Sequence, residues 1–187
     1  MKVKNLNIDG VKVIELSPIH DERGFFSRNY DVEIAKKAGF HRSWVQENVS
    51  FSKNAGTLRG IHFQLPPFAE TKLVRVLTGS VFDVFVDLRK DSPTFGKWGS
   101  YKLLSSNPEW IYLPKGIGHG MITLEDNMLM QYKVDSPFTP SADTQIKWDD
   151  PDLAIEWPVA PSIVSQKDQD AMSFREFQQK FGGLEIK

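Results

Sequence analysis

Apolar and polar residues alternate along many short stretches of this chain, a pattern typical of β-strands with one buried face. In the clearest stretch, residues 81–88, four apolar side chains share one face: Phe82, Val84, Val86 and Leu88. Two aspartates, Asp83 and Asp87, fall on the other face. The preceding Thr78-Gly79-Ser80 is a turn signal, and it predicts a hairpin between this strand and a strand at Lys72–Leu77.

Six further stretches have the same character and lie between clusters of Gly, Pro, Asn and Asp. They are Val11–Leu16, Gly56–Gln64, Gly99–Leu104, Glu109–Leu113, Gly120–Leu124 and Met128–Val134. Many short strands between turn signals predict an all-β antiparallel sandwich or barrel. Residues 1–50 are less regular and leave room for a strand that pairs with a second subunit.

Two short helices complete the predicted elements. One spans Asp31–Ala38, where Asp31 is an N-cap and Gly39 ends the helix. The other spans about Asp170–Lys180. Three aromatic residues recur in and just after it at helical spacing, which predicts a packed face rather than a binding site: Phe174, Phe177 and Phe181.

The composition limits partners and compartment. The chain carries a formal net charge of −1, so no overall positive field favours nucleic acid. It has no cysteine, which excludes disulfides and thiolate metal sites. No apolar signal region opens the chain, and charges interrupt every later apolar run, so neither export nor a membrane is expected. With 40% apolar residues, we expect one cytoplasmic domain over residues 1–187.

A histidine on one of the predicted strands carries the strongest candidate chemistry. His62 shares a strand face with Gly60 and Gln64, so its surroundings on that face are small and polar. Arg59 and Lys72 place two cations near it if the adjacent strands pair. This arrangement suits a base beside an anionic, phosphorylated substrate.

Metal binding is disfavoured by the residues around the two candidate histidines. Leu113–Gly120 has the Pro-x-Gly-x-x-His spacing of cupin barrels, and metal-binding cupins also carry His-x-His followed by Glu. Here the first pair reads His62-Phe63-Gln64, and Gln is a poor ligand for transition metals compared with imidazole. Glu70 lies too far along the chain. His62 and His119 are therefore left for proton transfer or structure.

Three other residues each have a structural interpretation beside a functional one. Tyr132 alternates with apolar residues on its strand and is expected to point inward, where a buried phenol needs a partner, either substrate or a backbone carbonyl. His119 follows a Pro-Lys-Gly turn, and both a structural and a functional role fit it. Asp168 precedes the last predicted helix, where a carboxylate is an ordinary stabiliser. Asp83 and Asp87 are rival partners for the strand histidine.

The ordered series of motifs resembles the dTDP-4-dehydrorhamnose 3,5-epimerases, cupin-fold enzymes of nucleotide-sugar metabolism. The matching segments run nearly from end to end: Asp21–Phe26, Gln46–Asn48, Leu58–Gln64, Lys72–Val74, Gly79–Arg89, Asp91–Gly96, Leu113–Gly120, Tyr132-Lys133, Trp148–Pro151, Trp157-Pro158 and Ser165–Asp168. The resemblance implies a cupin-type double-stranded antiparallel β-barrel, or jelly roll, with a few short helices. It also implies a homodimer and a reaction that needs no cofactor.

The resemblance further implies a role for each matching position. His62 would be the general base that removes the protons at C5 and C3 beside the C4 keto group, and Tyr132 would return a proton on the opposite face. Asp168 would orient His62 and support its charged form. Lys72 would stabilise the enolate oxygen. The remaining residues would bind the nucleoside diphosphate sugar, some of them across the dimer: Arg23, Phe26, Gln46, Asn48, Arg59, His119 and Phe138.

Two positions depart from the family pattern. Arg28 stands where many members have glutamate, at a position implicated in the nucleotide pocket, so the nucleotide is left open. Phe138 stands where the family often has tyrosine, so the number of inverted centres is left open. The expected function is inversion of C3 and C5 of a dTDP-4-dehydro-6-deoxyhexose. The alternatives are a single-centre epimerase, an enzyme for a CDP- or GDP-linked 4-keto sugar, and a non-catalytic cupin that binds sugar nucleotides.

Overall fold

Fourteen strands and three short helices make up residues 1–186 of the computed structural model; Lys187, the last residue of the predicted domain, lies outside the described residues. One sheet contains β1 (Lys2–Asn5), β2 (Lys12–Glu15), β5 (Gln46–Ser52), β7 (Lys72–Thr78), β10 (Glu109–Leu113) and β12 (Met128–Val134). The other contains β6 (Thr57–Gln64), β8 (Ser80–Asp87), β9 (Trp98–Leu104), β11 (Ile117–Thr123), β13 (Asp143–Gln145) and β14 (Ile163–Val164). A separate hairpin and the helices are β3 (Ile19–Asp21), β4 (Gly24–Phe26), α1 (Val32–Lys37), α2 (Gln166–Gln169) and α3 (Phe174–Phe181).

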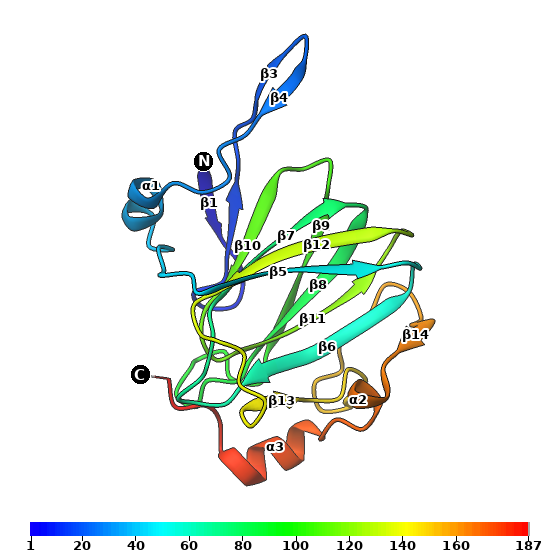
Figure 1. The fold of residues 1–187 in the computed structure, drawn as a ribbon. Helices are drawn as coiled ribbons and strands as arrows, with labels where there is room; N and C mark the ends of the chain where they lie inside the picture. The colour runs from blue at the N-terminus through cyan, green and yellow to red at the C-terminus, as the bar shows by residue number, and fades with distance from the viewer. Residues whose placement is uncertain (187) are drawn as a thin grey trace.

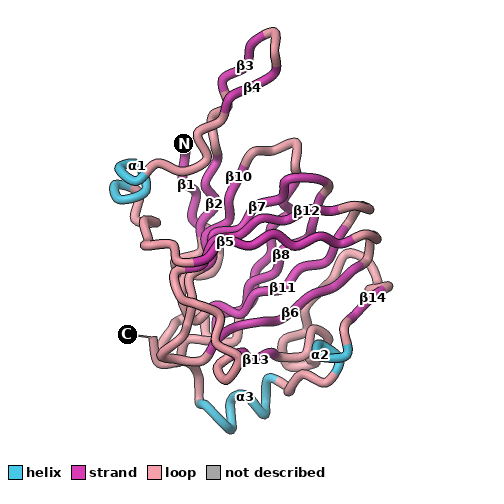
Figure 2. Tube along the Cα trace, in the orientation of Figure 1, coloured by secondary structure: helices cyan, strands magenta, loops and turns pink. Residues whose placement is uncertain are grey.

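The two large sheets face each other, as Figure 1 shows. The first sheet has the order β1-β2-β10-β7-β12-β5, and the second has the order β13-β6-β11-β8-β9, with β14 pairing in parallel to β6. All the other pairings between strands of these two sheets are antiparallel. In Figure 2 the helices lie at the periphery of this double-sheet barrel. The architecture is the predicted cupin-type all-β fold.

Apolar side chains fill the space between the sheets and also form clusters on part of each outer face. The interior cluster joins residues of both sheets, among them Val74, Phe85, Ile111 and Met121. Outside the second sheet, α3 packs its predicted Phe face onto Phe63, Val84, Val86 and Leu88. Outside the first sheet, α1 and the segment after it cover Leu73, Trp110 and Tyr112. Strand β8 is therefore buried on both faces, with its aspartates turned to the interior.

The predicted hairpin between Lys72–Leu77 and Val81–Leu88 is wrong. Both strands exist, but β7 pairs with β10 and β12, whereas β8 pairs with β9 and β11. Between them Gly79 has φ +78, which suits a tight turn. A turn signal in the sequence marks where the chain reverses, but the layer in which the next strand finds its partners is decided by packing. Here the chain crosses from one sheet to the other.

The helices differ from the prediction mainly at their starts. Asp31 caps α1 as expected, and its carboxylate accepts hydrogen bonds from the Glu33 and Ile34 backbone N–H groups. The last helix begins at Phe174 rather than near residue 170, because Ser173 and Glu176 form a capping box there. Residues 166–169 form the separate helix α2. No helix within residues 1–186 is long and apolar enough to cross a bilayer.

Candidate active site

A polar pocket of about 170 Å³ lies between the two sheets. The second sheet supplies one wall: Arg59 and His62 from β6, and His119, Gly120 and Met121 from β11. The first sheet supplies the other: Ser50 from β5, Lys72 from β7, and Met130 and Tyr132 from β12. The two cations expected near His62 are thus beside it, but β6 and β7 face each other across the barrel instead of pairing.

Two glycines set the shape of the histidine wall. A Cβ atom on Gly60, which has φ +124, would lie 2.4 Å from the Cα atom of Gly120, so only glycine allows β6 and β11 to approach this closely. His62 and His119 are direct partners across the two strands, and the register shifts between His119 and Met121. Such an irregularity re-aims side chains. Arg59 and His62 both line the pocket, although residues three positions apart on a regular strand point to opposite faces.

A carboxylate from a distant part of the chain holds His62. The Nε2 atom of His62 lies 2.5 Å from Oδ1 of Asp168 on α2, and Asp168 is buried. The other carboxylate oxygen, Oδ2, accepts a hydrogen bond of 2.7 Å from the Ser165 hydroxyl. Burial by itself would raise the pKa of Asp168, but the hydrogen bonds from His62 and Ser165 and the charge of His62 lower it overall. The carboxylate therefore stays ionised and fixes the imidazole.

The rival aspartates have other partners. Asp83 is fully buried and its Oδ2 atom lies 2.8 Å from Nε2 of His119, so the second histidine of the pocket also has a carboxylate behind it. Asp87 accepts hydrogen bonds from Arg89, Ser92 and Thr94 away from the pocket. In the structure, Asp168 is therefore the partner of His62, and Asp83 is the partner of His119.

The opposite wall carries a proton donor and a cation. Burial raises the pKa of Tyr132, the charge of Glu70 adds to this effect, and Arg59 partly opposes it. The phenol is therefore protonated at neutral pH. Lys72 extends its ammonium group into an ion pair with Glu70 at 3.2 Å, and both side chains are largely buried. A neutral acid and a fixed cation thus face the two histidines.

The edge strand β5 continues this wall toward solvent. Gln46, Asn48 and Ser50 alternate with exposed residues and lie on its more buried face, and Asn48 is the direct partner of Tyr132 across β5 and β12. Phe138 follows β12. Its backbone N–H donates to Oε1 of Gln46 at 2.7 Å, whereas the residue is 58% exposed.

The other candidate binding residues lie away from the pocket of their own chain. Arg23 and Phe26 belong to the β3–β4 hairpin, which projects from the barrel in Figure 1. Arg23 forms an exposed ion pair with Asp21 at 2.5 Å. Arg28 lies after the hairpin, with Nη1 at 3.5 Å from Oδ2 of Asp31. Neither hairpin residue is among the described side chains that line the pocket.

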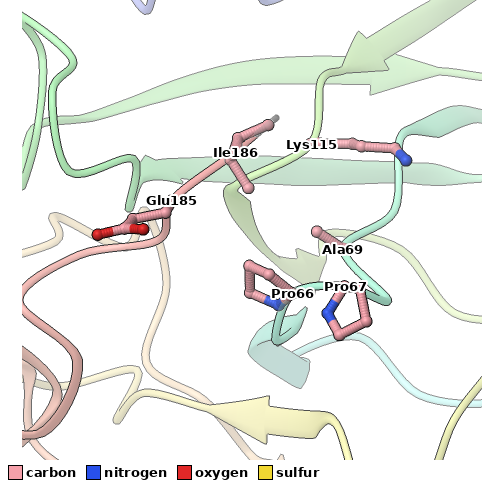
Figure 3. Close-up of a pocket in the computed structure, with 6 residues that line it drawn as sticks. All are labelled: Pro66, Pro67, Ala69, Lys115, Glu185 and Ile186. Carbon is pink, nitrogen blue, oxygen red and sulfur yellow. The ribbon is translucent and has the colours of Figure 1, made fainter.

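Another hollow, of about 380 Å³, lies beside the C-terminal segment. Figure 3 shows the rings of Pro66 and Pro67 next to each other, with Ile186 across from them. Lys115, Ala69 and Glu185 complete its lining. This lining holds no histidine or tyrosine, whereas His62, Lys72, His119 and Tyr132 all line the pocket between the sheets.

The residues present do not form a metal centre of the cupin type. Within residues 1–186, no group of three or more His, Asp or Glu side chains is placed to hold a metal ion. Gln64 occupies the position of the second histidine, and its amide is engaged in hydrogen bonds to protein groups. That the reaction needs no metal or cofactor stays a prediction.

Fold and site together define a cupin-type barrel with an acid–base site between its sheets. The family model described as dTDP-4-dehydrorhamnose 3,5-epimerase matches residues 5–176. A protein of that description from Sinorhizobium fredii is 40% identical over 187 residues, covering 100% of this chain and 96% of its own.

Solved structures of epimerases are also similar to this chain. A dTDP-4-dehydrorhamnose 3,5-epimerase from Bacillus anthracis, with TDP and PPi bound, has a TM-score of 0.90 at 43% identity and covers 92% of this chain and 99% of its own. ChmJ, a 3'-monoepimerase from Streptomyces bikiniensis in complex with dTDP-quinovose, has a TM-score of 0.88 at 30% identity, with coverages of 97% and 91%. The chain belongs to the dTDP-4-dehydrorhamnose 3,5-epimerase family, which makes it an isomerase of the epimerase type.

Sequence reasoning missed several residues that build the pocket. Ser50 lies two positions after Asn48 on the same strand face, so alternation alone could have found it. Glu70 was weighed only as a metal ligand, although its position two residues before Lys72 allows an ion pair. Met121 and Met130 line the pocket as well, and nothing in their strands separates them from ordinary core residues.

Proposed function

We propose that the chain inverts C3 and C5 of dTDP-4-dehydro-6-deoxyglucose to give the corresponding 4-keto-rhamnose. The observation that carries the proposal is that His62 and Tyr132 line one small pocket from opposite sheets. Inversion needs a proton to leave one face of a carbon and another proton to arrive at the opposite face. A base on one wall and an acid on the facing wall meet that need.

The C4 ketone acidifies the C–H bonds at both neighbouring carbons, so the protein has only to move protons and stabilise the enolate. His62 removes the proton, with Asp168 holding the imidazole in orientation. Lys72 stabilises the developing charge on the enolate oxygen, an electrostatic contribution that a largely buried cation makes efficiently. Tyr132 returns a proton from the other side. His119, backed by Asp83, binds the sugar beside His62.

The size of the pocket supports a proposal for where each part of the substrate lies. Its volume of about 170 Å³ lies below the roughly 300–1,000 Å³ usual for whole ligands. The hexose therefore occupies the pocket, and the nucleoside diphosphate extends outward. Gln46 and Asn48 on β5 and the exposed ring of Phe138 meet the nucleotide there, and Arg59 meets the pyrophosphate or the sugar.

We also propose a homodimer in which the hairpin brings Arg23 and Phe26 to the site of the second subunit. Large apolar side chains are exposed on the hairpin and on the outer face of β5, namely Ile19, Phe25, Phe26, Val49 and Phe51. Exposed clusters of this kind mark association surfaces. Light scattering after size-exclusion chromatography measures the oligomeric state, and a monomer would contradict this part of the proposal. The cytoplasmic location stays a prediction.

Proton NMR of dTDP-4-keto-6-deoxyglucose incubated with the enzyme in deuterated water tests the function. Deuterium at both C3 and C5, coupled to inversion, is the expected result. If no exchange occurs, the CDP- and GDP-linked sugars are tested next, because Arg28 replaces the family glutamate. Inertness toward all three would leave the non-catalytic sugar-nucleotide-binding protein as the better account.

The second candidate function is epimerisation at a single centre. Two observations favour it: Phe138 lacks the hydroxyl of the tyrosine frequent in the family, and a 3'-monoepimerase is among the structural neighbours. In the same NMR experiment, deuterium at one carbon alone would support it. The variant Phe138→Tyr would then be expected to restore exchange at the other carbon.

A further inference from the structure

Gln64 is a buried polar residue that the proposed mechanism does not use. It stands at the position where a metal-binding cupin has its second histidine, on the same face of β6 as His62, and it is 3% exposed. A buried amide must satisfy its donors and acceptor within the protein. Its partners therefore show what the side chain does.

Two of these partners bracket Phe138. The Gln64 Oε1 atom accepts a hydrogen bond of 2.6 Å from the backbone N–H of Thr139, and Nε2 donates to the carbonyl of Pro137 at 3.2 Å. One side chain thus holds the backbone on both sides of Phe138. Gln46 adds a third contact, through its hydrogen bond from the Phe138 N–H.

The same amide also reaches the segment that carries the pocket cation. Nε2 lies 3.2 Å from Oε2 of Glu70 and 3.1 Å from the carbonyl of Phe68. Glu70 in turn forms the ion pair with Lys72. Gln64 therefore connects the loop at Phe138 to the segment that leads into β7.

The result is a fixed backbone beneath an exposed aromatic ring. An aromatic residue in that state gives a flat apolar contact surface, and little conformational freedom remains for it to lose when a ligand binds. We propose that Gln64 is a positioning residue that holds Pro137–Thr139 so that Phe138 is in place to receive the nucleotide of the substrate. The inference rests on the proposed function, which supplies that nucleotide.

A double-mutant cycle on dTDP binding tests the proposal. Gln64→Met removes all the hydrogen bonds at nearly constant volume, and isothermal titration calorimetry measures the Kd. With Phe138 present, we expect Gln64→Met to raise the Kd about tenfold, the effect of losing roughly one or two hydrogen bonds. In a Phe138→Ala background the same change is expected to raise it by less than about twofold, because the effects of coupled residues do not add.

Gln131→Met is the matched control. Gln131 is also a strand glutamine, but it hydrogen-bonds Arg75 and Glu47 and does not line the pocket. It is expected to leave the Kd unchanged. Equal increases for Gln64→Met in both backgrounds, or no increase, would overturn the proposal. If Gln64→Met fails to fold, Gln64→Asn, whose shorter side chain cannot reach both loop groups, takes its place in the cycle.

Amide hydrogen exchange separates failure of this proposal from failure of the proposed function. Without ligand, the Phe138 and Thr139 amides are expected to exchange faster in Gln64→Met than in the wild type, with exchange in β12 unchanged. Unchanged exchange would overturn the positioning role. A wild-type protein that binds no nucleoside diphosphate would contradict the proposed function, and the exchange result would still decide whether Gln64 holds the loop.

Discussion

Two histidines line the pocket, and each is bonded through Nε2 to a buried aspartate, but the two pairs differ in exposure and in the origin of the carboxylate. His62 has a side chain that is 33% exposed and a carboxylate partner from α2, more than a hundred residues along the chain. His119 has a side chain that is 11% exposed and a partner on the adjacent strand β8. The two imidazoles are direct partners across β6 and β11. The same chemical pair thus occurs twice, once accessible and once enclosed.

The second oxygens of the two carboxylates sharpen the contrast. Oδ2 of Asp168 is bonded to the Ser165 hydroxyl, whereas Oδ1 of Asp83 is buried without a hydrogen-bond partner among the described residues. A fully bonded carboxylate fixes its histidine in one orientation. An accessible, well-oriented imidazole suits proton transfer, and an enclosed one suits binding. The comparison therefore supports His62, rather than His119, as the proposed base.

Replacing each histidine separately gives the largest expected difference in kinetic constants between the two pairs. His62→Asn is expected to lower kcat roughly 10²–10⁴-fold, the usual contribution of a general base. His119→Asn is expected to act mainly on KM, by about tenfold, since it removes a hydrogen bond rather than the base. Steady-state kinetics on variants with unchanged circular dichroism checks both values. Equal losses of kcat would remove the distinction between the two pairs.

The carboxylates give a smaller but more specific contrast. Asp168→Asn is expected to lower kcat about 10–100-fold, because it takes away one charge-assisted hydrogen bond that orients the base. Asp83→Asn is expected to change the free energy of unfolding by about 1–3 kcal/mol, because it alters a buried polar pair, with a smaller effect on kcat. Kinetics and urea unfolding on the same preparations separate the two outcomes. A larger kcat loss for Asp83→Asn would reverse the assignment.

Acid stability gives the smallest effect. Burial alone would raise the pKa of Asp168, but His62 and Ser165 hold this pKa below its ordinary value of 3.8. A carboxyl group with a lowered folded-state pKa contributes stability above its unfolded pKa and loses it as the pH falls through the folded value. The unfolding free-energy difference between wild type and Asp168→Asn should therefore persist down to about pH 4 and shrink below it. A difference that disappears above about pH 5 would contradict this.

The sequence predicted the strands of the barrel core and the face of His62 because those depend on local alternation. It did not predict β5, because that strand turns polar Asn48 inward and apolar Val49 and Phe51 outward, the reverse of a core strand. The choice of Asp168 over Asp83 depends on where α2 docks, which no local pattern records. The predicted hairpin between Lys72–Leu77 and Val81–Leu88 was wrong for a related reason. The sheet that a strand joins depends on packing between distant parts of the chain, which local sequence does not record.

The central claim is that base and acid act from opposite walls, and Tyr132→Phe in deuterated water tests it most directly. In this variant His62 still removes a proton, exchanges it with solvent deuterium and returns deuterium to the same face, but no phenol delivers a proton on the far side. Proton NMR should therefore show deuterium entering the substrate at C3 or C5 without inversion, whereas His62→Asn should show neither exchange nor inversion. Inversion at a near wild-type rate in a folded Tyr132→Phe protein would contradict the account.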